Sequence, residues 1–292
     1  MEGIQFLING LIAGSIYALV AIGFALIYRV TKFFHFAHGA VLTIAAYSTY
    51  FFTAILKFPL LGAAIISVVI ATFSGGMIDL LVYRPMRARK ASSLVLLLAS
   101  LGVFIVVQNF ISLFFGDDPL SIRGGGIEIG VNIVGARIMI AQLRIVVASA
   151  ILSAITAYAL QATRFGKTLR AVANDRELAL ISGIDTERVI FYTFLLGSAL
   201  AACAAILIAL DSALTPLVSI NILFMAIVAM IIGGAGSIIG SLAGGIFLGV
   251  VQNLTVWVIG SQWQITITFT ILLLFLLFRP YGFLGRPKEA RV

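Results

Sequence analysis

The chain has 292 residues, of which 62% are hydrophobic and 10% are charged, and its formal net charge is +8. Soluble domains average roughly 25% charged residues, so this composition excludes a soluble domain and indicates several membrane-spanning helices of about 20 apolar residues each. The basic residues cluster in short segments between apolar runs, so a positive-inside topology explains the net charge without a nucleic-acid partner.

Nine apolar runs define the expected all-α polytopic membrane fold. In chain order we expect spans at about 4–28, 40–56, 61–83, 92–115, 143–160, 189–210, 220–232, 241–259 and 264–278. Glycines interrupt spans 1 and 7, and a break in either would change the count to eight or ten. No basic segment precedes the first span, which we therefore expect to act as its own signal.

The positions of the basic residues orient these spans. With the N-terminus outside, all but four of the 19 arginines and lysines fall on the cytoplasmic side, the exceptions being Lys57, Arg123, Arg137 and Arg144. The glycine-rich loop at about 116–142 is then external. The alternation of Ile127, Ile129 and Val131 predicts a small hairpin within it.

Two features near the cytoplasmic ends of the early spans resemble functional sites. His35 and His38 lie three residues apart, but no carboxylate or cysteine lies nearby to complete a metal site, so we expect no metal there. Asp79 is an intramembrane acid and therefore a functional candidate by default. Its position near the interface favours a structural role instead, in which it pairs with Arg84 or with a neighbouring loop.

The stretch from 164 to 188 is the most polar part of the chain, with nine charged residues in 25. Charges at this density are excluded from hydrocarbon, so the stretch is a cytoplasmic loop. Two apolar sets at helical spacing predict short helices inside it: Leu169, Val172 and Ala173, and then Leu178, Leu180 and Ile181. Gly183 is typical of a residue just beyond a helix end. Such an apolar stripe docks either on a separate partner or on the chain's own helix ends, and the pattern favours neither.

The sequence carries no sign of catalysis. Gly166-Lys167-Thr168 looks like the end of a phosphate-binding loop, but that motif needs glycine where Gln161 stands, and the segment follows a membrane helix rather than a strand. We therefore predict that the chain is not an enzyme, binds no cofactor of its own and does not hydrolyse ATP. Because no series of buried acids crosses the membrane either, the energy for any transport has to come from a motor subunit, and the loop at 164–188 is where one could dock.

Several motifs resemble the permease family of branched-chain amino acid ABC importers, in that family's order and over nearly the whole chain. They are Asn9-Gly10-Leu11 through Leu19, Phe36-Ala37-His38-Gly39, Tyr83-Arg84-Pro85, Gly166-Lys167 with Arg170-Ala171-Val172, Gly183-Ile184-Asp185, Gly233-Gly234 with Gly236-Ser237, and Arg279-Pro280.

This resemblance implies a single permease domain over 1–292 in a multi-pass protein of the bacterial inner membrane. It also implies a complex of two permeases, two cytoplasmic ATPases that bind ATP and magnesium, and a periplasmic solute-binding protein. The coupling helix that contacts the ATPase would lie within Gly166–Asp185. The expected coupling residues are Gly166, Leu169, Arg170, Val172, Ala173, Asp175, Arg176, Glu177 and Leu178.

One departure from the family concerns His35, because asparagine usually precedes Phe-Ala-His-Gly. Related permeases carry urea, short amides or other amino acids. The resemblance therefore leaves other amino acids open as the solute, and a urea or amide importer permease is an alternative function. A stand-alone secondary transporter of similar hydropathy is a second alternative, and copurification of an ATPase distinguishes it from an importer subunit.

Two further sets of residues are predicted from the spans. Uncharged polar residues recurring within spans are expected to line the solute pathway: Asn9, Ser15, Tyr17, Gln108, Asn109, Asn221, Gln252 and Asn253. Small residues spaced by four are expected to let helices approach closely: Gly10 and Gly14 on the first span, and Gly236, Gly240 and Gly244 on the eighth.

Overall fold

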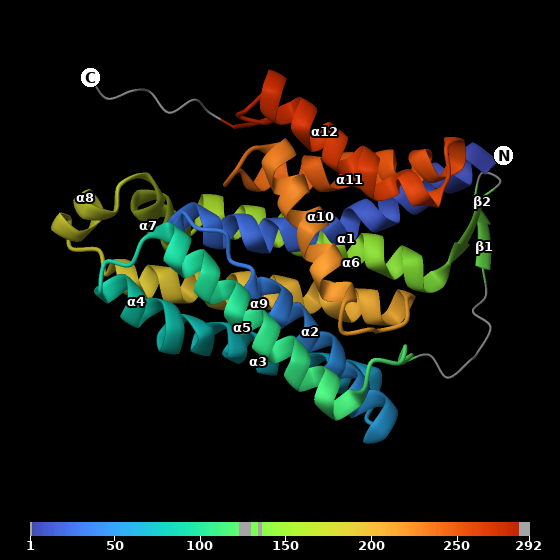
Figure 1. Cartoon of the computed structure of the whole chain (residues 1–292), viewed down its shortest axis with the longest axis horizontal. Helices are drawn as coiled ribbons and strands as arrows, with labels where there is room; N and C mark the ends of the chain where they lie inside the picture. Colours follow the sequence, from blue (N-terminus) through green and yellow to red (C-terminus); the bar gives the residue numbers. More distant parts are fainter. Residues whose placement is uncertain (1, 123–129, 134–135, 286–292) are drawn as a thin grey trace. The chain divides into compact units, whose positions relative to one another are not determined.

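The computed structural model describes residues 2–122, 130–133 and 136–285. Over these residues the chain is mostly helical and contains one two-stranded sheet (Figure 1). Apolar segments form helices because hydrocarbon offers no hydrogen-bond partner, so each backbone N–H and C=O is satisfied within its own helix.

The helices and strands follow in chain order. They are α1 (Glu2–Thr31), α2 (Ala37–Tyr50), α3 (Leu60–Ile78), α4 (Arg84–Ala88), α5 (Ser93–Phe115), β1 (Gly130–Ile133), β2 (Ala136–Met139), α6 (Ile140–Ala162), α7 (Arg164–Asn174), α8 (Arg176–Ile181), α9 (Thr186–Asp211), α10 (Val218–Gly233), α11 (Ile238–Val258) and α12 (Gln264–Phe278). Two π-helical segments continue α2 and α3, at Phe51–Ile55 and Asp79–Tyr83, and a 3₁₀ turn at Ser261–Trp263 precedes α12.

Each of the nine predicted spans coincides with a helix, which confirms a mostly helical fold with about nine apolar helices in the described residues. Among the described residues, seven helices are long and apolar enough to cross a membrane, and α10 is a shorter apolar helix of 16 residues. The first span is one continuous helix of 30 residues despite its glycines.

The structure divides into two compact units. The first comprises Met1–Ala25, Ile127–Ser153 and Phe224–Val292, and the second comprises Leu26–Gly126 and Ala154–Leu223. The single domain expected over 1–292 stays a prediction.

In the second unit, α2, α3 and α9 pack on one another, and α5 packs on α2. Glycine permits the contact between α3 and α9, because a Cβ added at Gly75 would lie only 1.9 Å from Oγ of Ser198. Side chains along most of α2 are buried. These helices therefore form the rigid centre of the second unit.

In the first unit, α1 and α11 touch backbone to backbone. A Cβ added at Gly10 would lie 2.7 Å from Cα of Val250, and one at Gly14 would lie 2.8 Å from Cα of Ile246. On the facing helix, a Cβ at Gly249 would lie 2.3 Å from the backbone nitrogen of Gly14. Glycines on both helices thus allow this approach, although Gly249 was not among the packing glycines predicted from the sequence.

A second glycine-dependent contact in the first unit joins α10 to α11. A Cβ at Gly240 would lie 2.2 Å from the carbonyl oxygen of Gly233, and one at Gly244 would lie 2.1 Å from that of Ala229. Gly236 differs from the predicted stripe, because it lies in the turn before α11 and has φ +84°. It serves the turn conformation, which disfavours residues with a side chain.

The hairpin expected in the external loop is present as β1 and β2. The strands are antiparallel, with Val131 opposite Ile138 and Gly130 opposite Met139. The predicted residues Ile127 and Ile129 lie outside the described residues.

Candidate functional site

The polar loop predicted at 164–188 folds into two short helices, as expected from its apolar spacing. Thr163 caps α7 by accepting a hydrogen bond from the backbone of Gly166, at 3.1 Å. The carboxylate of Asp175 caps α8 by accepting from the backbone N–H groups of Glu177 and Leu178, at 3.1 and 3.0 Å. Gly183 follows α8 with φ +80°, which confirms it as the residue beyond the helix end.

Helix α7 is anchored to its own chain. A Cβ at Gly166 would lie 2.0 Å from the carbonyl oxygen of Leu160 in α6, and Arg170 donates a hydrogen bond to that same oxygen. The side chains of Leu169 and Val172 are buried. The apolar stripe of α7 therefore covers neighbouring parts of the chain, which is one of the two roles that the sequence left open.

Helix α8, in contrast to α7, exposes most of its apolar side chains. The side chains of Leu178 and Leu180 are more than half exposed, and Ile181 is 85% exposed. Only Ala179 of this helix is buried. A capped helix of six residues therefore carries three exposed aliphatic side chains at the same end of the second unit as α4 and α7 (Figure 1).

A buried ion pair lies in the same unit, where α3 continues through the π-turn Asp79–Tyr83 into α4. Nη1 of Arg87 donates to Oδ1 of Asp79 at 2.7 Å, and the two side chains are 5% and 1% exposed. From the sequence, Arg84 or a neighbouring loop was the expected partner, and the structure places Arg87 there instead. In an α-helix, residues eight apart are about 80° out of alignment around the axis. The π-turn inserts one residue, so Arg87 takes the place of a residue seven positions on, about 20° from Asp79.

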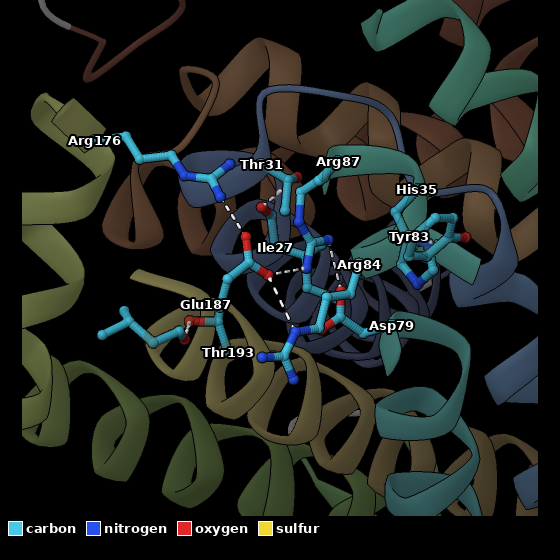
Figure 2. Close-up of polar contacts among 11 residues, drawn as sticks. Ile27, Thr31, His35, Asp79, Tyr83, Arg84, Arg87, Arg176, Glu187 and Thr193 are labelled. Carbon is cyan, nitrogen blue, oxygen red and sulfur yellow. Dashed lines mark hydrogen bonds and ion pairs between the residues drawn. The ribbon is translucent and has the colours of Figure 1, made fainter. Parts of the chain in front are cut away.

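Glu187, in the first turn of α9, connects this ion pair to α8. Its Oε2 accepts from Nη2 of Arg87 at 2.8 Å, and its Oε1 accepts from Nη2 of Arg176 on α8. Nε of Arg84 lies 4.0 Å from the same Oε2. Figure 2 shows the Glu187 carboxylate between Arg176 on one side and Arg84, Arg87 and Asp79 on the other. We refer to these five residues as the ion-pair network.

Exposure within the ion-pair network decides the strength of each contact. The side chains of Arg176 and Glu187 are 40% and 25% exposed, so their pair contributes about 0–1 kcal/mol, as surface pairs do. Removing one partner from the buried Asp79–Arg87 pair would cost about 3–5 kcal/mol, because an unpaired charge would remain inside the protein. The network thus has a strong inner contact and a weak outer one.

An aromatic cluster surrounds His35, in the segment between α1 and α2. Nδ1 of His35 lies 3.0 Å from the hydroxyl of Tyr83, and its ring centroid lies 5.0 Å from that of Phe194 and 5.9 Å from that of His38. Burial lowers the pKa of His35 well below its usual range, and the neighbouring His38 acts in the same direction. A neutral imidazole packed against aromatic rings is what this geometry supports.

The residues predicted to line a pathway are divided between the two units. Asn9, Ser15, Tyr17, Gln252 and Asn253 belong to the first unit, and Gln108, Asn109 and Asn221 belong to the second. Of these, Asn109 and Asn221 are exposed and Gln252 is buried. Their common role as a pathway lining stays a prediction.

Three of these side chains donate hydrogen bonds, and those of Gln252 join different helices. Nε2 of Gln252 on α11 donates to Oγ1 of Thr268 on α12 at 2.8 Å and lies 2.9 Å from Sδ of Met225 on α10. Asn253 and Asn109 each donate to a carbonyl four residues earlier in their own helix. Gln252 thereby joins three helices of the first unit.

Sequence reasoning missed Arg87 and Glu187 as members of a site. Arg87 stood in a basic cluster, where no periodicity separates a buried arginine from an exposed one. Glu187 lies among other charged residues just before a predicted span, so the sequence pattern did not distinguish it from the rest of the loop. The sequence offered one indication of the pair, an acid inside a predicted span followed two turns later by an arginine. The π-turn that aligns these two residues has no recognisable sequence pattern.

The fold and these features define a multi-pass α-helical membrane protein with a capped, partly exposed helix pair in its most charged loop. The family model described as "Branched-chain amino acid transport system / permease component" matches residues 6–278. The chain is 33% identical over 306 residues to the high-affinity branched-chain amino acid transport system permease protein LivH of Salmonella typhimurium, covering 99% of this chain and 97% of that protein. It is also 33% identical over 303 residues to the corresponding permease protein BraD of Pseudomonas aeruginosa, covering 99% and 98%.

The chain therefore belongs to the permease component family of branched-chain amino acid transport systems. Its fold is similar to a chain of the solved structure "PsaBC from Streptococcus pneumoniae in complex with Fab", with a TM-score of 0.51 and 16% sequence identity over 95% of this chain and 94% of that one. At this identity the likeness concerns the fold alone.

Proposed function

We propose that this chain is the membrane-spanning subunit of an ATP-driven importer that carries branched-chain amino acids across the bacterial inner membrane. The observation that carries the proposal is the 33% identity, over nearly the whole length, to permease proteins named for high-affinity branched-chain amino acid transport. Its expected complex contains a second permease subunit, two cytoplasmic ATPases that bind ATP and magnesium, and a periplasmic solute-binding protein.

The solute pathway in this proposal is lined by uncharged polar side chains, which suit a zwitterion that has to pass without tight binding. The residues proposed for it are Asn9, Ser15, Tyr17, Gln108, Asn109, Asn221, Gln252 and Asn253. A urea or amide permease is the alternative function, raised by related permeases and by His35 in place of the usual asparagine. The His35 side chain is fully buried against Tyr83 and Phe194, which supports a packing role for it.

The ATPase docks on α8 in this proposal, and α7 holds α8 in place. Exposed apolar side chains on a water-facing loop mark an interaction surface, and Leu178, Leu180 and Ile181 provide one. The buried side chains of Leu169 and Val172 fix α7 to the rest of the second unit. A rigid support of this kind is what a docking helix needs to pass movement on to the membrane helices.

Transport by the reconstituted complex tests the proposed function. The permease, its partner ATPases and the binding protein are placed in liposomes, and uptake of radiolabelled leucine, isoleucine, valine and urea is measured with and without ATP. ATP-dependent uptake of the branched-chain amino acids, and not of urea, is expected. Equal uptake without ATP would favour the secondary transporter instead.

Copurification tests the docking surface. Ile181→Asp places a charge on the most exposed apolar residue of α8, and we expect ATPase subunits to be lost from the purified complex. Gln161→Glu is the matched control, because it adds the same charge at an exposed position near the end of α6. Retention of the ATPase by Ile181→Asp would rule out α8 as the docking helix.

A further inference from the structure

The ion-pair network forms a continuous connection from α8 to the π-turn Asp79–Tyr83. Three successive ion pairs join Arg176 to Glu187, Glu187 to Arg87, and Arg87 to Asp79. Side-chain exposure falls along this series from 40% at Arg176 to 1% at Asp79. The connection therefore begins in solvent, on the helix with the exposed apolar side chains, and ends inside the second unit.

The inner end of the connection is held firmly. Arg87 uses one guanidinium nitrogen for Asp79 and another for Glu187, at 2.7 and 2.8 Å. Such paired, charge-assisted contacts fix direction as well as distance. The π-turn brings Asp79 and Arg87 onto one face, and its Tyr83 contacts His35 at the entry to α2. These contacts connect Glu187 to the junction of α2, α3 and α4.

The outer end can change partners. Glu187 binds Arg176 through Oε1 and Arg87 through Oε2, so either contact can open without the other. Nε of Arg84 lies 4.0 Å from Oε2, and the Arg84 side chain is 55% exposed. Arg84 can therefore balance the negative charge of the Glu187 carboxylate when Arg176 moves away from it. Separation of α8 from α9 would therefore not leave Glu187 without a counter-charge.

We propose that Glu187 is a positioning residue that couples the movement of α8 to the π-turn, by holding Arg176 in one state of the transport cycle and releasing it in another. This inference rests on the proposed function, because it takes α8 to be the helix on which the ATPase acts. The network does not bind the ATPase or the solute. It determines how much of the ATPase's movement reaches the membrane helices.

Variants of the outer pair test the proposal in the complete complex. Arg176→Gln and Glu187→Gln keep polar side chains of similar size but remove the ion pair. We expect both to retain bound ATPase while amino acid uptake per ATP hydrolysed falls at least about fivefold, the lower end of typical coupling between sites. Glu187→Gln removes the contact with Arg176 and also weakens the one with Arg87. The double variant should therefore be no worse than Glu187→Gln alone.

Two controls separate coupling from general damage. Arg188→Gln removes a neighbouring but exposed ion pair, Arg188–Asp185, and should leave the ratio of uptake to hydrolysis at its original value. Arg176→Lys keeps the positive charge and should restore most of the ratio that Arg176→Gln loses.

The possible results point in different directions. An unchanged ratio in Arg176→Gln and Glu187→Gln would overturn the proposal, and so would additive losses in the double variant. Loss of bound ATPase from Arg176→Gln would assign Arg176 to docking and also overturn it. If the unmodified permease itself bound no ATPase, the proposed function would fail first, and that result is distinct from a failure of the network.

Discussion

The buried pair Asp79–Arg87 predicts an unequal response to the loss of its two members. In Arg87→Met, the Asp79 carboxylate stays 1% exposed and loses its guanidinium partner. Its Oδ2 already has no hydrogen-bond partner within the described part of the chain, so no second contact compensates. We expect a loss of about 3–5 kcal/mol in the free energy of unfolding.

Asp79→Asn should be milder, because Arg87 keeps its contact with Glu187 and the amide oxygen can still accept a hydrogen bond. The expected loss is about 1–3 kcal/mol, the cost of weakening a buried hydrogen bond. The double variant Asp79→Asn with Arg87→Met contains no unpaired buried charge. It should therefore be more stable than Arg87→Met alone, although it carries one more substitution.

Thermal unfolding of the four proteins in detergent, followed by circular dichroism, measures this order. Arg188→Met is the matched control, because that arginine is 79% exposed and pairs only across the surface, so its midpoint should stay within experimental error of the unmodified protein. Additive losses in the double variant would refute the reasoning, since the two residues would then not act on each other.

Two further predictions concern packing and pH. Gly244→Leu should prevent folding of the first unit, because even a Cβ there would lie 2.1 Å from the carbonyl oxygen of Ala229. Gly102→Leu should be tolerated, because, outside its own helix backbone and chain neighbours, no atom of the described residues lies within 4 Å of a Cβ at that position. The yield of monodisperse protein in detergent compares the two variants, and a normal yield from Gly244→Leu would contradict the packing argument. Because burial lowers the pKa of His35, the unfolded state takes up a proton first as the pH falls below about 6.5, so stability should decline there and His35→Asn should flatten that decline. Unfolding midpoints measured between about pH 5 and 8 test this, and an equal slope in both proteins would exclude His35 as its source.

Much of the fold could be predicted because hydrophobicity determines it directly. Each predicted span became a helix, since a run of about 20 apolar residues has few alternatives in a membrane. The end of α8 could also be predicted from the local sequence, because a glycine such as Gly183 readily adopts the positive φ that is common just beyond a helix end. These features depend on residues close in sequence, which is the information a single sequence provides.

The partners of charged and apolar side chains could not be predicted in the same way. Spacing identified the stripe of Leu169 and Val172, but a stripe buried by the chain itself has the same period as one buried by another subunit. Spacing likewise grouped Gly236 with Gly240 and Gly244, although α11 begins only at Ile238. Periodicity describes a helix that already exists, and it does not tell where that helix begins or what covers it.

The register change at the π-turn explains why the ion-pair network escaped sequence reasoning, and it also bears on function. If the same residues formed a regular α-helix, Arg87 would point about 80° away from Asp79, and the buried carboxylate would lose this partner. An inserted turn of this kind is frequent at functional sites. In this chain it aligns an intramembrane acid with an arginine that also reaches Glu187 at the start of α9. The same local distortion that pairs the buried charge therefore also connects α3 to the loop that carries α8.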